Sequence, residues 1–167
     1  MSFEFARPFY QSGVSGIQTT QPDQSFIDED TIPPQTWIDV PAYYAGRNVP
    51  DISFNADPDT GYVVYYTSSV TGFSKQTFWG GTSFVAPELN GVMGLIGQYL
   101  ETRIGLLNVP MYQLATGPGA YTGDGAPFNV IKYGNNDFYL GRDGYSPAAG
   151  IGTLDVANFA EALKKTY

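Results

Sequence analysis

The hydrophobic pattern predicts one long central helix with two strands before it. Residues 83–102 are apolar on nearly every side, which is typical of a helix in the centre of a domain. Residues 62–67 are β-branched and aromatic and predict a buried strand. Residues 68–72 predict a turn, and residues 75–79 a second strand that leads to the helix.

The C-terminal part predicts two shorter helices with a long loop between them. Residues 108–114 carry a proline near their first turn and predict a short helix, whereas the glycines of residues 117–152 predict loop. Asp155 is placed as the N-cap of a closing helix, whose apolar side chains recur at i, i+3, i+4 and i+7: Val156, Phe159, Ala160 and Leu163. Glu161 and Lys165 are expected to pair on its surface.

The chain thus reads as one domain part, residues 1–167, in three stretches. Residues 1–46 are mostly loop around an acidic segment, residues 47–116 hold the strands and the long helix, and residues 117–167 hold the loop and the closing helix. This content indicates an α/β fold. Because a parallel sheet needs several covered strands, we expect an upstream segment to complete it, and we expect the chain alone not to fold stably.

Candidate chemistry lies at the start of the long helix, in Gly80-Gly81-Thr82-Ser83. The glycines allow a tight turn and a close approach of backbone to a substrate. Ser83 is expected at or just before the helix N-terminus, where free N–H groups favour a developing negative charge. Pro87 fits only near the start of this helix. The segment allows two interpretations, a nucleophilic serine or an ordinary N-cap serine.

Four segments in series favour the nucleophile. Gly81-Thr82-Ser83 with Pro87 resembles the Gly-Thr-Ser-x-x-x-Pro motif of subtilase-like peptidases. Residues 47–62, with Pro50-Asp51, resemble a Pro-Asp-Val-Ser segment of the sedolisins, the serine-carboxyl peptidases. Residues 128–152 resemble the calcium-loop region of that family, and residues 8–11 its Pro-x-Tyr-Gln. The order matches, so the chain is identified as the C-terminal part of a sedolisin-like catalytic domain.

The resemblance implies a subtilisin-like parallel sheet flanked by helices, of which this chain is the C-terminal half. It also implies an acid-active, secreted endopeptidase of an extracellular or acidic compartment, in which Ser83 forms an acyl-enzyme with a polypeptide substrate. The implied Glu base, its orienting Asp and the Asp that donates to the oxyanion all belong upstream of Met1, so none is assigned here.

Within this chain no other residue supplies the missing base. The sequence has no His, so it cannot complete a Ser-His-Asp triad by itself. Glu88 follows Ser83 by five residues, about 140° around a helix, and points elsewhere. Asp51 and Asp57 are expected in turn or capping roles. A carboxylate base with a pKa of about 4 suits acid conditions.

The calcium loop departs from the family. The resemblance implies two Asp ligands, and Val130 and Ser146 stand at those positions. Only Asp137 or Asp143 could substitute from a shifted place. Because calcium depends on carboxylate oxygens, we expect a loop packed without metal, no cofactor, and a melting temperature that calcium leaves unchanged.

Composition excludes several other classes. The chain holds 16 Asp and Glu against 8 Lys and Arg, a net charge of −8, which argues against nucleic acid as a partner. Only 14% of residues are charged, which suits acid conditions. No apolar run is long enough for a membrane span, and the absence of Cys excludes disulfides. Two alternatives stay open: a neutral subtilisin-like enzyme with an upstream Asp–His pair, and a non-catalytic binding or assembly scaffold.

Overall fold

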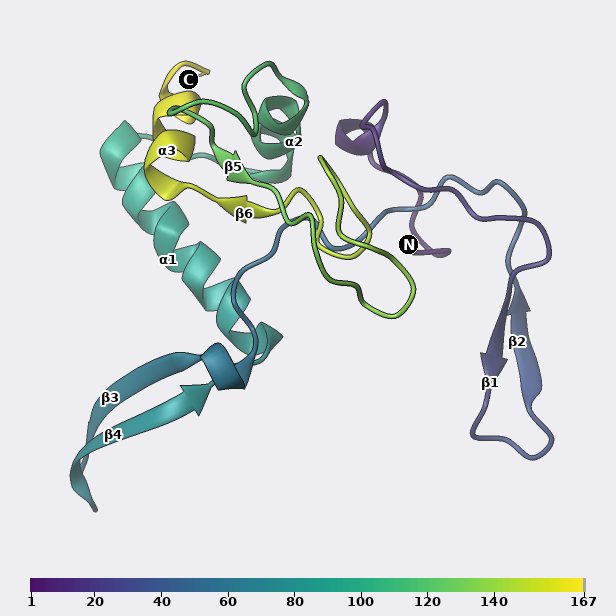
Figure 1. Cartoon of the computed structure of the whole chain (residues 1–167), viewed down its shortest axis with the longest axis horizontal. Coiled ribbons are helices and arrows are strands. Elements are labelled where there is room, and N and C mark those ends of the chain that lie inside the picture. Colours follow the sequence, from purple (N-terminus) through teal and green to yellow (C-terminus); the bar gives the residue numbers. More distant parts are fainter. Residues whose placement is uncertain (167) are drawn as a thin grey trace.

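The computed structural model describes residues 1–166 and contains one long helix, shorter helices and separate two-stranded sheets (Figure 1). In chain order the elements are η1 (Phe9–Gln11), β1 (Ser25–Asp28), β2 (Gln35–Asp39), η2 (Pro58–Thr60), β3 (Tyr62–Ser68), β4 (Gly72–Trp79), α1 (Thr82–Leu100), α2 (Asn108–Thr116), β5 (Phe128–Asn129), β6 (Thr153–Leu154) and α3 (Val156–Lys164).

The strands pair only with antiparallel neighbours in the described part of the chain. β1 pairs with β2, β3 with β4 and β5 with β6, each as a separate two-stranded sheet. The mixed helix and strand content fits an α/β fold, but these residues do not form the parallel sheet that the resemblance implies. The physical reason is local, because strands joined by a short turn, as β3 and β4 are, can pair only antiparallel.

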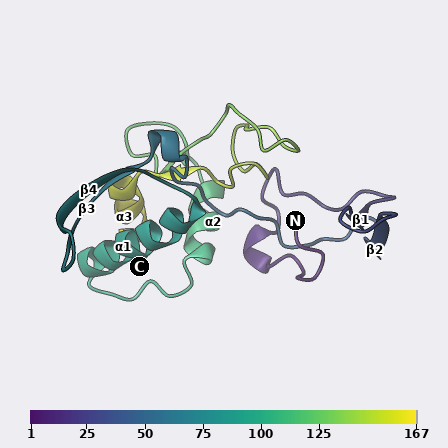
Figure 2. The same ribbon diagram turned by 90° about the horizontal axis from the view of Figure 1, so that it is seen from below.

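Two hairpins project from opposite ends of the molecule (Figures 1 and 2). The β1–β2 hairpin interrupts the loop expected over residues 1–46, and Phe26 packs on Trp37 within it. The β3–β4 hairpin confirms both strands and the turn predicted over residues 62–79. The predicted burial of β3 is wrong, since Tyr65 and Tyr66 are 59% and 42% exposed. Tyr62 at the base of the hairpin stacks on Phe84 of α1, whereas Tyr65 and Tyr66 further along β3 stay open to solvent.

The long helix α1 starts and ends close to the predicted bounds, but it is buried on one side only. Ile96 is buried, and Leu89, Val92 and Met93 pack beside it against the core. The opposite face is exposed over a stripe of small residues that includes Pro87, Gly91 and Gly94. None of the helices in the described residues is long and apolar enough to cross a bilayer.

The core lies among α1, α2, α3 and the loop that joins the last two. Its buried side chains include Ile96, Met111, Tyr112, Phe128, Tyr145, Ile151, Phe159 and Leu163. The closing helix matches its prediction, because Asp155 Oδ1 accepts a hydrogen bond from Asn158 N at 3.0 Å and the side chains of Phe159, Ala160 and Leu163 are buried. The predicted Glu161–Lys165 pair is absent from the ion pairs of residues 1–166; Tyr99 Oη donates to Glu161 instead.

Candidate active site

The turn before α1 is held against residues 56–58. Gly81 N donates to Ala56 O, and Gly81 adopts a φ of 96°, a conformation that favours glycine. A Cβ on Gly80 would lie 2.6 Å from Pro58 N and 2.8 Å from Ala56 O, so only glycine fits there. The two glycines therefore position the first turn of α1, as the motif predicts.

Ser83 is the second residue of α1 and is exposed. The N-cap is Gly81, which makes no side-chain cap, so Ser83 does not have the role of an N-cap serine. In the part of the chain that the structure describes, the Ser83 hydroxyl has no hydrogen-bond partner, which leaves it free to meet a reactant. Ser83 lies in the first helical turn, where N–H groups have no i−4 acceptor, although Phe84 N donates to Gly81 O at 3.0 Å.

Pro87 lies further inside the helix than expected, at its sixth position. Proline has no N–H, so the carbonyl of Ser83 receives no i to i−4 hydrogen bond. The first turn of α1 is consequently tied less firmly to the second turn than in a regular helix.

The carboxylates near this turn are already engaged, and none of them reaches Ser83. Glu88 accepts a hydrogen bond from Tyr62 Oη at 2.9 Å, which points it toward β3. Asp57 caps η2 through Asp59 N at 2.9 Å, as expected. Asp51 belongs instead to a buried network that sequence reasoning missed.

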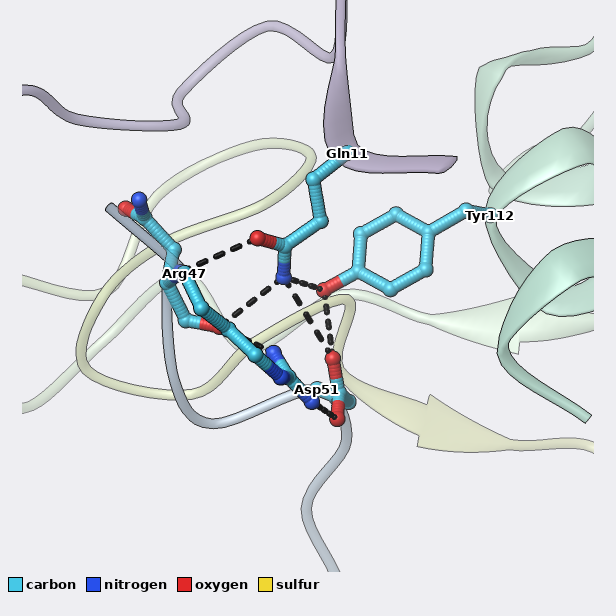
Figure 3. Close-up of polar contacts among 5 residues, drawn as sticks. Gln11, Arg47, Asp51 and Tyr112 are labelled. Atoms are coloured by element: carbon cyan, nitrogen blue, oxygen red, sulfur yellow. Dashed lines mark hydrogen bonds and ion pairs between the residues drawn. The ribbon is translucent and has the colours of Figure 1, made fainter. Parts of the chain in front are cut away.

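Figure 3 shows this network, which joins η1, residues 47–51 and α2. Gln11 Nε2 donates to Asn48 O and to Tyr112 Oη, both at 2.8 Å, while Gln11 Oε1 accepts from Asn48 N at 2.9 Å. Tyr112 Oη donates to Asp51 Oδ1 at 2.8 Å, and the second oxygen of Asp51 pairs with Arg47 Nη2 at 2.5 Å. Gln11 and Tyr112 are 101 positions apart, so no local sequence pattern predicts their contact.

Tyr112 is held in its neutral form. Burial, and then the negative charge of Asp51, raises the pKa of Tyr112 far above its ordinary value. Burial likewise raises the pKa of Tyr145. A neutral Tyr112 donates to Asp51, so the network ties the N-terminal segment to α2.

An apolar hollow lies beside the candidate nucleophile. It has a volume of about 620 Å³ and is lined by residues 50–54, by the first half of α1 and by the start of α2. Thr82, which directly precedes Ser83, lines its edge. A side chain or strand with an apolar surface could fill this space.

The predicted calcium positions do not fit a carboxylate-bound ion. Val130 has no side-chain oxygen, and the buried Ser146 Oγ accepts a hydrogen bond from Ala149 N at 3.1 Å. Of the two possible substitutes, Asp143 is paired with Lys132 at 2.7 Å, and Asp137 is exposed at the loop tip. Across residues 1–166, no three His, Cys, Asp or Glu side chains gather in one place.

Comparison with known proteins places the chain in context. No family model matches it. Kumamolisin from Bacillus sp. strain MN-32, a sedolisin, is 33% identical to it over 154 residues, which is 89% of this chain and 25% of kumamolisin. The chain therefore spans about a quarter of the length of this relative. The similarity extends along nearly the whole chain and confirms what the four motifs indicate: this chain is a relative of kumamolisin within the sedolisin family.

Proposed function

We propose that the chain is the serine-bearing part of an acid-active, sedolisin-like endopeptidase, with Ser83 as its nucleophile. The observation that carries the proposal is the exposed Ser83, which follows the Gly80–Gly81 turn and does not serve as the N-cap of α1. The similarity of the chain to kumamolisin supports it.

The reaction would be acyl transfer. Ser83 Oγ attacks the carbonyl carbon of the peptide bond and gives its proton to a base, and the tetrahedral oxyanion forms near the start of α1. Collapse expels the amine, which takes up that proton, and leaves an acyl-enzyme on Ser83. Water then hydrolyses the ester and restores the hydroxyl.

In this proposal the base comes from outside these residues. Glu88, Asp57 and Asp51 each hold a structural partner and none reaches Ser83. The sedolisin resemblance implies that a Glu and two Asp of an upstream segment or chain act with Ser83. Without that segment the chain is inactive in this proposal, because a serine hydroxyl alone is a weak nucleophile.

The exposed face of α1 is where the upstream segment would pack. Pro87, Gly91 and Gly94 present little side-chain bulk there, which lets a neighbouring backbone approach closely. The parallel strands of a subtilisin-like sheet would cover this face and the open aromatic side chains of β3 and β4. Large uncovered apolar surfaces of this kind favour association, so the chain alone would fold poorly.

The charge pattern suits work in acid. When the 16 carboxylates are protonated, only the eight Lys and Arg side chains stay charged, so few positive charges repel one another. We therefore propose a secreted enzyme of an extracellular or acidic compartment that acts on polypeptides and not on nucleic acids.

A non-catalytic scaffold is the second candidate function. It is favoured by the absence of carboxylates at Val130 and Ser146, since a lost metal site can accompany lost activity. A neutral subtilisin-like enzyme is the nearest chemical rival and would need an upstream His.

The test uses the full-length protein that carries this chain. Peptide cleavage is measured between about pH 3 and 5 and again near pH 7. Ser83→Ala is expected to lower kcat more than about a thousandfold, whereas Ser69→Ala, a matched change in the exposed turn after β3, is expected to leave it unchanged. Equal cleavage by the parent and Ser83→Ala would refute catalysis by Ser83. Activity confined to neutral pH would favour the subtilisin-like rival, and an inactive parent the scaffold.

A further inference from the structure

We propose that Arg142 is a built-in cation that holds the loop of residues 128–152 against the N-terminal segment and makes this loop independent of calcium. The resemblance places a metal in this loop, yet its donors do not fit one. The loop must therefore be ordered by other means.

Arg142 binds two backbone carbonyl groups at once. Its Nη2 donates to Gly16 O at 2.8 Å, and its Nε donates to Tyr145 O at 3.1 Å. Gly16 and Arg142 are 126 positions apart, so the guanidinium joins two segments that are distant in the sequence. Carbonyl oxygens are also ligands that calcium uses, and a guanidinium offers them a permanent positive charge in a fixed planar fork.

Gly16 is shaped for this contact. A Cβ at this position would lie 2.3 Å from Tyr145 O and 2.7 Å from Arg142 Nη2. Its φ of 97° also disfavours other residues. The N-terminal segment therefore reaches the loop only because residue 16 has no side chain.

The two limbs of the loop also close on each other without an ion. Gly141 N donates to Gly134 O at 2.9 Å, and a Cβ on Gly141 would lie 2.8 Å from Ile131 O. Lys132 and Asp143 pair across the limbs. This exposed pair contributes little, but it neutralises the carboxylate next to Arg142.

Fixing Tyr145 O steadies the turn that follows. Ser146 N donates to Gly150 O at 2.9 Å and Gly150 N to Ser146 O at 2.7 Å. The chain then continues into Ile151, whose N donates to Asp51 O at 2.8 Å. The loop thereby supports the segment that lines the apolar hollow through hydrogen bonds of the protein itself.

Hydrogen exchange of the full-length protein tests the proposal locally, whatever metal is bound elsewhere. The amides of Ser146, Gly150 and Ile151 are followed in EDTA and in about 1 mM calcium. In the parent we expect the same exchange rates in both. In Arg142→Gln we expect these amides to exchange about three- to tenfold faster, with no recovery in calcium. The control Arg103→Gln removes an exposed arginine after α1 and should match the parent.

Arg142→Lys keeps the charge but lacks the fork, so its rates should lie between those of the parent and Arg142→Gln. Faster exchange of the parent in EDTA, reversed by calcium, would overturn the proposal, and this measurement needs no variant. Parent-like exchange in Arg142→Gln would overturn it as well.

Discussion

Removing the hydroxyl of Tyr112 should destabilise the protein more than removing that of Tyr121, which has no hydrogen-bond partner in the described residues. Tyr112 is 1% exposed, so water cannot replace the two hydrogen bonds that Tyr112→Phe deletes, one from Gln11 Nε2 and one to Asp51. Both partners keep a second contact, Gln11 with Asn48 O and Asp51 with Arg47. Neither polar group is left without a partner, and this limits the loss of stability.

The magnitude follows from these contacts. A bond to a charged carboxylate contributes about 1.5–3 kcal/mol, and a neutral bond about 1 kcal/mol. Since both partners are partly satisfied without Tyr112, we expect the free energy of unfolding to fall by about 2 kcal/mol. The loss should be independent of calcium.

Urea unfolding of the full-length protein near neutral pH measures this change. Tyr121→Phe is the matched control, because Tyr121 packs on Phe128 with ring centroids 5.9 Å apart, while its hydroxyl has no hydrogen-bond partner in the described residues. We expect the control to stay within about 0.5 kcal/mol of the parent. If Tyr112→Phe unfolds at the parent's urea concentration, or if both variants lose the same stability, the network does not hold η1 to α2.

Two further predictions concern alkaline pH and the closing helix. Burial raises the pKa of Tyr112 and Tyr145 well above the value of about 10 for free tyrosine, and that of Tyr121 to about 12. The stabilisation from these neutral phenols is therefore complete below about pH 10 and falls as the pH rises further, by up to about 1.4 kcal/mol per pH unit for each. Unfolding measured against pH should show this decline, with a smaller slope in Tyr112→Phe; a flat profile from pH 9 to about 11 would contradict it. Asp155→Ala should cost about 1 kcal/mol by removing the N-cap of α3, measured by urea unfolding against Asp124→Ala, an exposed loop residue; equal stability of the two variants would argue against the cap.

Local patterns were sufficient for the helices and for the place of the serine. The apolar run after Gly81 predicted α1, and Asp155 with the spacing behind it predicted α3. The β-branched and aromatic residues 62–67, with the turn that follows them, predicted the β3–β4 hairpin. These signals come from interactions between residues a few positions apart in the chain, so they can be read without knowing the fold. The four motifs indicated the family from the sequence because each is a contiguous segment of the chain.

Only the tertiary structure decided which faces of the helices and strands are buried and which polar groups form hydrogen bonds. The sequence of β3 fits a buried strand, but burial depends on a partner layer that the described residues do not provide. The joining of Gln11 to Tyr112, and of Gly16 to Arg142, depends on the path of more than a hundred intervening residues. The first contact joins two side chains and the second joins a side chain to a backbone carbonyl, and no period or spacing in the sequence predicts either of them. Sequence alone therefore determined the three helices, the β3–β4 hairpin and the candidate nucleophile, whereas the β1–β2 hairpin and the contacts that hold the N-terminal segment in place appear only when the chain is folded.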